Sequence, residues 1–165
     1  MERDLSKDGS KGGDPMSLAF AEARSAELCG EAPIGAALIR DGTLIASAGN
    51  RTRELNDPTA HAEMLVIREA AAKIGAERLV GCDLYVTLEP CAMCAGAIVQ
   101  SRIARLVYGA ADLKAGACAS LYRLVSDRRF NHQVRISAGI LGEECGEILT
   151  DFFQERRAFR RLGEE

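Results

Sequence analysis

Apolar residues recur along this chain at helical spacing in some segments and in short runs in others, which predicts alternating helices and strands. The first amphipathic segment should begin at Asp14-Pro15, a capping residue followed by proline, and end at Gly30. Two apolar runs then flank Asp41-Gly42, a dipeptide typical of a β-hairpin. The predicted elements are a helix at 15–29, strands at 34–40 and 44–50, a helix that starts at Asp57-Pro58-Thr59 and ends at 74, a strand at 84–88, a helix at 91–101, a strand at 105–108, a short helix or turn at 120–126, a strand at 134–138 and a helix at 142–161.

The order of these elements predicts one α/β domain. The segments 84–88, 91–101 and 105–108 form a β-α-β unit whose strands should be parallel. With the hairpin added, we expect a three-layer α/β/α sandwich around a mixed five-stranded sheet. Residues 1–14 are polar and predict a disordered N-terminal extension, so the domain should span 15–165. The small residues at 110–120 predict a loop that approaches another part of the molecule closely.

Composition bears on compartment and partners. No run of 18 apolar residues is present, so no membrane span is expected, and six scattered cysteines favour a reducing, cytoplasmic compartment. The four cysteines outside the C-x-x-C pair, Cys29, Cys82, Cys118 and Cys145, should be buried or partly buried. A net charge of −3 argues against a broad nucleic-acid binder.

The charge is unevenly distributed. Residues 1–100 hold 10 Lys and Arg against 15 Asp and Glu, whereas residues 101–165 hold 11 against 9. A polyanion site would therefore lie in the second part of the chain. The arginine cluster Arg156, Arg157, Arg160 and Arg161 could form such a site or simply a solvated helix face, and the two interpretations have equal weight.

Two short motifs carry the candidate chemistry: His61-Ala62-Glu63 and Pro90-Cys91-Ala92-Met93-Cys94. His61, Cys91 and Cys94 supply three ligands of the kinds that zinc prefers, and a catalytic zinc keeps its fourth position for water. Glu63 follows the histidine closely enough to exchange protons with that water. We expect Pro90 to be the first residue of a helix, whose dipole would favour the thiolate forms of the cysteines.

Other interpretations of these motifs remain open. A C-x-x-C pair alone can be a redox dithiol or half of a structural zinc site. A structural site would need a fourth ligand, and Cys82 or Cys118 could serve, although neither belongs to a second C-x-x-C pair. A redox dithiol would leave His61 and Glu63 without a role, so the catalytic interpretation is favoured.

From about Met16 onward, the chain resembles the cytidine-deaminase-like superfamily, whose zinc-dependent nucleobase deaminases have an H-x-E … P-C-x-x-C signature. Within it, the chain is most similar to the bacterial tRNA-specific adenosine deaminases. The resembling segments are 32–36, 49–51, 56–63 and 84–97, and, more selectively, 112–117, 131–132 and 151–153. The resemblance implies a cytoplasmic homodimer with one Zn²⁺ per chain that converts the wobble adenosine of a tRNA anticodon stem-loop to inosine.

The resemblance also implies roles for individual residues. His61, Cys91 and Cys94 would bind zinc, and Glu63 would carry protons. The implied substrate-binding residues are Asn50 and the Ala62 backbone N–H on the flipped base, Ile34 and Leu88 as pocket walls, and Asp112, Lys114, Asn131, His132, Phe153 and Arg157 along the anticodon loop. The chain departs from the family pattern at Gly49, Cys118 and Ala119, which we expect to flank the pocket.

Two alternative functions use the same motifs. The first is deamination of a free nucleobase or nucleoside such as guanine or cytidine, which would need zinc and Glu63 but not the basic second part of the chain. The second is a non-catalytic, zinc-stabilised RNA-binding subunit. That alternative would not need Glu63, whose presence in register argues against it.

Overall fold

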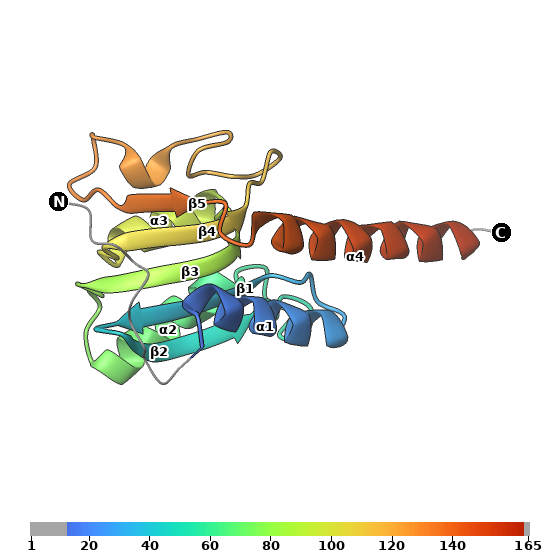
Figure 1. Ribbon diagram of the computed structural model, residues 1–165, viewed down its shortest axis with the longest axis horizontal. Helices are drawn as coiled ribbons and strands as arrows, with labels where there is room; N and C mark the ends of the chain where they lie inside the picture. The colour runs from blue at the N-terminus through green and yellow to red at the C-terminus, as the bar shows by residue number, and fades with distance from the viewer. Residues whose placement is uncertain (1–12, 164–165) are drawn as a thin grey trace.

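A mixed sheet in the order β2-β1-β3-β4-β5 organises the chain in the computed structural model, which describes residues 13–163 (Figure 1). Most of the predicted N-terminal extension, residues 1–12, lies outside the described residues. The elements are α1 (Pro15–Leu28), β1 (Gly35–Arg40), β2 (Thr43–Gly49), α2 (Ala62–Ile74), β3 (Cys82–Leu88), α3 (Ala92–Gln100), β4 (Arg105–Ala110), the 3₁₀ turn η1 (Leu124–Ser126), β5 (Arg135–Ala138) and α4 (Gly142–Leu162).

The predicted mixed, three-layer architecture is confirmed. Strand β1 pairs antiparallel with both β2 and β3, whereas β3, β4 and β5 are parallel. Helices α2 and α3 cover one face, where Val66 and Ile98 belong to the same buried cluster as Leu84. Helix α1 covers the other face, where Met16 packs in a cluster with Val107. None of the helices within residues 13–163 is long and apolar enough to cross a membrane.

Glycines bring α1 close to the sheet. A Cβ atom on Gly35 of β1 would lie 2.0 Å from the Ala19 carbonyl oxygen of α1, and one on Gly49 of β2 would lie 2.6 Å from that of Glu22. Atoms cannot approach so closely, so the helix can occupy its place only because both side chains are absent. Gly49 therefore faces α1, and its departure from the family pattern concerns helix packing, contrary to our expectation that it flanks the pocket.

Helix α4 begins against β4 and then extends beyond the rest of the fold (Figure 1). A side chain on Gly109 of β4 would collide with the thiol of Cys145, so this first part of the helix lies directly on the sheet. Ile148, Leu149 and Phe152 are buried on its inner side, whereas Phe153 is 45% exposed.

The starts of two helices differ from the prediction. Helix α2 begins at Ala62 with His61 as its N-cap, because Asp57 closes a separate turn by accepting the backbone N–H of Thr59 at 2.8 Å. Helix α3 begins at Ala92 with Cys91 as its N-cap, so Pro90 is not helical. Helix α2 thus starts about four residues later than predicted and α3 about two residues later, which places a candidate metal ligand at each cap.

The small-residue loop also contributes to the core, which the sequence did not predict. Ala117 and Cys118 are buried in the cluster beneath α2 and α3, because the loop turns inward between β4 and η1. Cys29 is exposed rather than buried, since it lies just beyond the end of α1.

Candidate metal centre and active site

The N-termini of α2 and α3 bring three candidate ligands together. His61 caps α2, Cys91 caps α3, and Cys94 lies in the first turn of α3. The histidine Nδ1 lies 3.6 Å from the Cys91 Sγ and 3.5 Å from the Cys94 Sγ. Their ligand atoms all lie within 4.8 Å of one another, and no other group of three or more potential ligands is found within residues 13–163.

This triangle has the dimensions of a zinc site. Tetrahedral bonds of typical Zn–N and Zn–S length place nitrogen and sulfur about 3.6 Å apart, which matches both measured separations. Three ligands leave a fourth position for water, as in a catalytic site. Cys82 and Cys118, the candidate fourth ligands of a structural site, are not part of the cluster.

The electrostatics of the cluster also suit a cation. A hydrogen bond from the Cys94 thiol lowers the pKa of Cys91 to about 4, and contact with His61 acts in the same direction. The same bond, together with burial, raises the pKa of Cys94. Both helix N-termini direct their positive dipole ends at this point, which further favours thiolate.

Glu63 is buried beside these ligands and has a free oxygen. Its side chain lies in the first turn of α2 and is 4% exposed. Its Oε2 atom has no hydrogen-bond partner among the described residues, which is rare for a buried carboxyl oxygen. Burial raises the pKa of Glu63 to about 7. A carboxyl with these properties can both accept and release a proton near neutral pH.

Asn50 and Ala62, the two residues expected to contact a flipped base, contact each other. The buried Asn50 lies just after β2, and its Oδ1 accepts the backbone N–H of Ala62 at 3.1 Å. This bond ties the end of β2 to the start of α2, next to His61. The structure thus places both residues at the metal centre.

A cavity of about 670 Å³ gathers six of the other predicted substrate-binding residues. It lies between the carboxyl end of β3, the loop after β4 and one side of α4. Its lining includes Ile34, Leu88, Asp112, Lys114, Phe153 and Arg157. Leu88 precedes Cys91 by only three residues, so the cavity wall continues directly into the metal-binding turn.

Glu89 holds the loop that forms one wall of this cavity, a role the sequence analysis missed. Its carboxylate is 1% exposed and accepts backbone N–H groups from Asp112, Cys118, Ala119 and Ser120, and also the Ser120 hydroxyl. Burial alone would raise the pKa of Glu89, but these hydrogen bonds outweigh it and hold the pKa below its ordinary value. The sequence signal was a charged residue directly after the apolar run 84–88.

The same loop contains Cys118 and Ala119, the other two departures from the family pattern, and it approaches Glu89 closely at Gly116. Gly116 forms an isolated bridge with Cys91, and a Cβ atom at Gly116 would lie 2.4 Å from the Glu89 side chain. The predicted close approach of this loop is thus to Glu89. Cys118 points into the core, while Ala119 is exposed.

Asn131 and His132 lie at the other end of α3. The Asn131 side chain accepts a hydrogen bond from Arg102, and a His132 ring nitrogen contacts the Ile103 carbonyl oxygen at 2.7 Å. Both partners follow the C-terminus of α3, whereas the ligand cysteines lie at its N-terminus. A helix of nine residues separates the two ends by about 14 Å.

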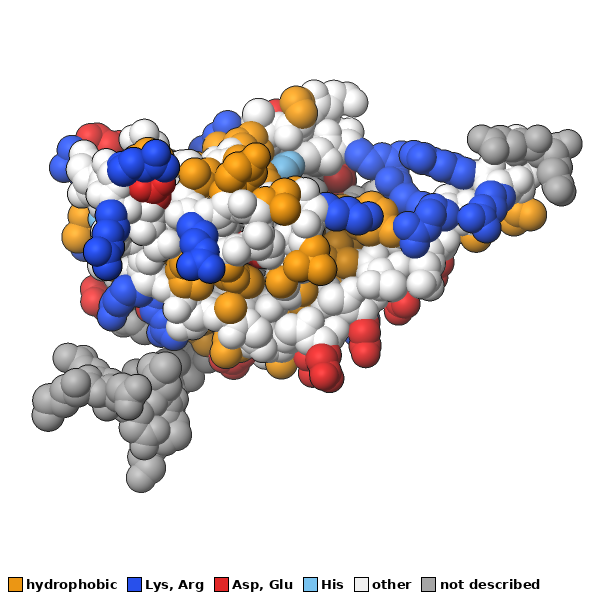
Figure 2. All heavy atoms as spheres, turned by 90° about the horizontal axis from the view of Figure 1, so that it is seen from above, with side chains coloured by type: hydrophobic (Ala, Val, Ile, Leu, Met, Phe, Trp, Pro, Cys, Tyr) orange, Lys and Arg blue, Asp and Glu red, His pale blue; other side chains and the backbone are white. Residues whose placement is uncertain are grey.

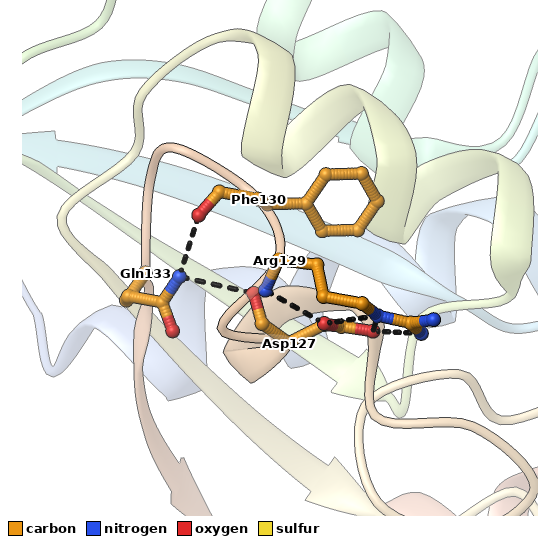
Figure 3. Close-up of polar contacts among 4 residues, drawn as sticks. All are labelled: Asp127, Arg129, Phe130 and Gln133. Atoms are coloured by element: carbon orange, nitrogen blue, oxygen red, sulfur yellow. Dashed lines mark hydrogen bonds and ion pairs between the residues drawn. The ribbon is translucent and has the colours of Figure 1, made fainter.

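The loop that carries Asn131 and His132 is closed by its own polar contacts (Figure 3). The Gln133 side-chain amide donates to the carbonyl oxygens of Asp127 and Phe130, both at 3.0 Å. Arg129 pairs with Asp127, which lowers the pKa of Asp127 to about 2. These contacts fix the loop where it is, so the structure does not bring Asn131 and His132 to the metal centre of the same chain.

Comparison with known proteins shows that the chain is similar to deaminases in both sequence and structure. The MafB19-like deaminase family matches residues 13–157. A "tRNA-specific adenosine deaminase" of Agrobacterium fabrum is 56% identical over 142 residues, which are 86% of this chain and 93% of the relative. A structure from a study of "A-to-I Editing by tRNA:A34 Deaminases" is also 56% identical, with a TM-score of 0.79 over 82% of this chain and 98% of that one. A guanine deaminase structure from Bacillus subtilis is 40% identical but covers 59% of this chain and 62% of its own, with a TM-score of 0.57.

Proposed function

The chain belongs to the MafB19-like deaminase family, and on this basis we propose that it is a zinc-dependent hydrolase that converts adenosine to inosine at the wobble position of a tRNA anticodon loop. The observation that carries the chemistry is the His61, Cys91 and Cys94 triangle beside a buried Glu63 with a free oxygen. The observation that favours RNA over a free base is the similarity to tRNA-specific adenosine deaminases, which extends over nearly the whole domain.

His61, Cys91 and Cys94 would hold the metal, and the bound zinc would supply a water that ionises near neutral pH. Glu63 then moves the protons. It accepts one from the attacking water and delivers it to N1 of the adenine ring, and it passes the second proton to the leaving amino group. Adenosine and water thereby give inosine and ammonia, and Glu63 ends in its starting state.

Asn50 and the cavity residues orient the substrate. An unpaired loop lets a base leave its stack at modest cost, because no base pair has to be broken. Asn50 is fixed by its bond to the Ala62 backbone and would donate its amide NH₂ to the ring, while Ile34 and Leu88 would form apolar walls. Lys114 and Arg157 place positive charge at the cavity, where the flanking phosphates would lie.

A homodimer and a cytoplasmic location complete the proposal. Asn131 and His132 lie at the end of α3 opposite the metal centre of their own chain, an arrangement that supports their contacting RNA bound at the site of a second copy. All six cysteines are free thiols, which supports a reducing compartment.

The test compares possible substrates side by side. Zinc-loaded protein is incubated with an anticodon stem-loop that carries adenosine at the wobble position, and separately with free guanine, cytidine and adenosine. The products are analysed by mass spectrometry. Inosine in the RNA, with the small molecules unchanged, is the expected result. Ammonia from guanine or a nucleoside, with the RNA unchanged, would overturn the proposal in favour of a small-molecule deaminase.

A further inference from the structure

Four residues form a recess of about 430 Å³ beside α4, outside the cavity already described. Arg156, Phe159 and Arg160 come from α4, and Arg53 comes from the loop after β2. Three of the four lining residues are arginines, and no carboxylate lines the recess. We call this set the Arg53 cluster. Lys and Arg side chains gather over the same protruding part of α4 in Figure 2.

Two of the arginines meet at one carbonyl group. Arg53 Nη1 and Arg156 Nη2 each donate to the Gly30 carbonyl oxygen at 3.1 Å. Gly30 follows the C-terminus of α1, where the helix dipole makes carbonyl oxygens attractive to cations. A guanidinium has five N–H donors, so each arginine uses only one of them in this contact.

Both side chains are fixed before any ligand arrives. The backbone N–H of Arg53 donates to the buried carboxylate of Glu31 at 2.9 Å, which holds the loop in place. The Arg156 guanidinium lies over the ring of the buried Phe152, 4.8 Å from its centroid. A ligand would therefore find the donors already ordered and would lose little affinity to ordering them.

The arginines of the Arg53 cluster form no ion pair within residues 13–163. The ion pairs formed within residues 13–163 are Arg40 with Asp41, Arg51 with Glu54, Lys73 with Glu69, and Arg129 with Asp127. None of them includes an arginine of the cluster. The neighbouring Glu31 forms no ion pair with the cluster, and its oxygens accept two backbone N–H groups and a threonine hydroxyl. Three cations around one recess repel each other, and an anion there would offset this repulsion.

We propose that the Arg53 cluster binds a backbone phosphate of the RNA substrate, at a second site separate from the base pocket; this rests on the proposed function. Phe153 and Arg157 line the 670 Å³ cavity described above. Arg156 and Arg160 of the Arg53 cluster lie on the same helix, within three residues of Arg157. An RNA strand that leaves the cavity along α4 therefore reaches the cluster next. Planar guanidinium groups suit phosphate, and Phe159, 77% exposed, offers a stacking surface beside them.

The test measures how RNA binding depends on salt. The ligand is the inosine-containing product stem-loop, which is not consumed, and its dissociation constant is measured by fluorescence anisotropy over a range of salt concentrations. The double variant Arg53→Ala, Arg160→Ala is compared with the unaltered protein. Arg78→Ala is the matched control, since it removes an exposed arginine near the start of β3, at the end opposite the cavity. The double variant Arg53→Lys, Arg160→Lys keeps the positive charge at both positions.

The double alanine variant should bind the stem-loop about tenfold more weakly, and the slope of log Kd against log salt should fall by about 1, because counterion release scales with the number of phosphates contacted. The lysine variant should regain the slope, and kcat at saturating RNA should not change. A double alanine variant with the affinity and slope of Arg78→Ala would overturn the second site. So would a fall in kcat with an unchanged KM, since the cluster would then serve the base pocket. If the unaltered protein deaminates the wobble-adenosine stem-loop in either case, the proposed function stands. If it neither binds the inosine stem-loop nor deaminates the adenosine one, both proposals fail.

Discussion

Removal of the Glu89 carboxylate tests whether a buried anion organises the wall of the active site. The carboxylate is almost fully buried, forms no ion pair with any residue of 13–163, and accepts four backbone N–H groups and one hydroxyl. In Glu89→Ala all five donors lose their acceptor. A hydrogen bond to a charged group contributes about 1.5–3 kcal/mol, but water can reach the donors of the exposed part of the loop. We therefore expect the free energy of unfolding to fall by about 3–5 kcal/mol.

Glu89→Gln gives a sharper test because it keeps the shape and one acceptor. The amide oxygen can replace Oε1, which accepts three N–H groups, while the amide NH₂ then replaces Oε2. There it faces the Ser120 hydroxyl, which can turn to accept, and the N–H of Asp112, which cannot. One donor is thus left unpaired, and the expected loss is about 1–3 kcal/mol.

Urea denaturation of the zinc-loaded protein measures both losses, with Ser120→Ala as a control that removes only the hydroxyl. The expected order of stability is the unaltered protein, then Ser120→Ala, then Glu89→Gln, then Glu89→Ala. Because the loop lines the cavity, Glu89→Gln should also raise KM for the RNA more than it lowers kcat. A Glu89→Ala protein as stable as the unaltered one would refute the reasoning.

Three further predictions follow from individual contacts. Gly35→Ala should lower the free energy of unfolding by about 3 kcal/mol or more, because α1 would have to move off the sheet. Gly96→Ala is the control: this position in α3 has open space around it, so stability should stay unchanged or rise by up to about 1 kcal/mol. Equal stabilities of the two variants in thermal melts would contradict this. Cys91→Ala should reduce bound zinc from one per chain to nearly none by elemental analysis, and tight retention of one zinc would show that the ligand set is wrong. The carboxyl of Asp127 should titrate by NMR near pH 2, and Arg129→Ala should bring its pKa back toward about 4. The stabilising contact is therefore complete above pH 4 and is lost as the pH falls toward 2. An unshifted pKa of Asp127 in the unaltered protein would refute the pairing.

The order and type of the elements could be predicted from the sequence because each has a local signal. Asp14-Pro15 and Gly75 mark helix ends, and Asp41-Gly42 marks the hairpin, where the structure has them. The hairpin and the β-α-β unit gave the β1–β2 and β3–β4 pairings, and the five strands were all identified, but the β1–β3 and β4–β5 pairings were not predicted. Such signals act over a few residues, so they can be read without knowing the fold.

The exact starts of α2 and α3 could not be predicted in this way. A proline near a helix start can be its first residue or can precede the cap, and the distinction depends on tertiary contacts. Here the bond from Ala62 to Asn50 and the bridge between Cys91 and Gly116 fix the chain in an extended form up to the ligands. These partners lie 12 and 25 residues away in the sequence, outside the range of any local pattern.

The roles of buried polar residues were the least predictable part of the site. Glu89 and Glu31 each hold a loop through backbone N–H groups, and a backbone donor leaves no trace in the sequence of its own segment. Arg53 meets α4 only because Gly30 ends α1 at that point. By contrast, the metal ligands and Glu63 were recognisable because their spacing is set by the chemistry of the ion.

The most direct test of the account is the activity of Glu63→Gln at full zinc occupancy. The substitution removes the proton carrier but changes none of the three ligands, so zinc content and RNA affinity should equal those of the unaltered protein. The rate of inosine formation in the wobble-adenosine stem-loop should fall by about 10²-fold or more, the usual contribution of general acid–base catalysis. A zinc-loaded Glu63→Gln protein that still forms inosine within about tenfold of the normal rate would contradict the assignment of Glu63 and the mechanism built on it.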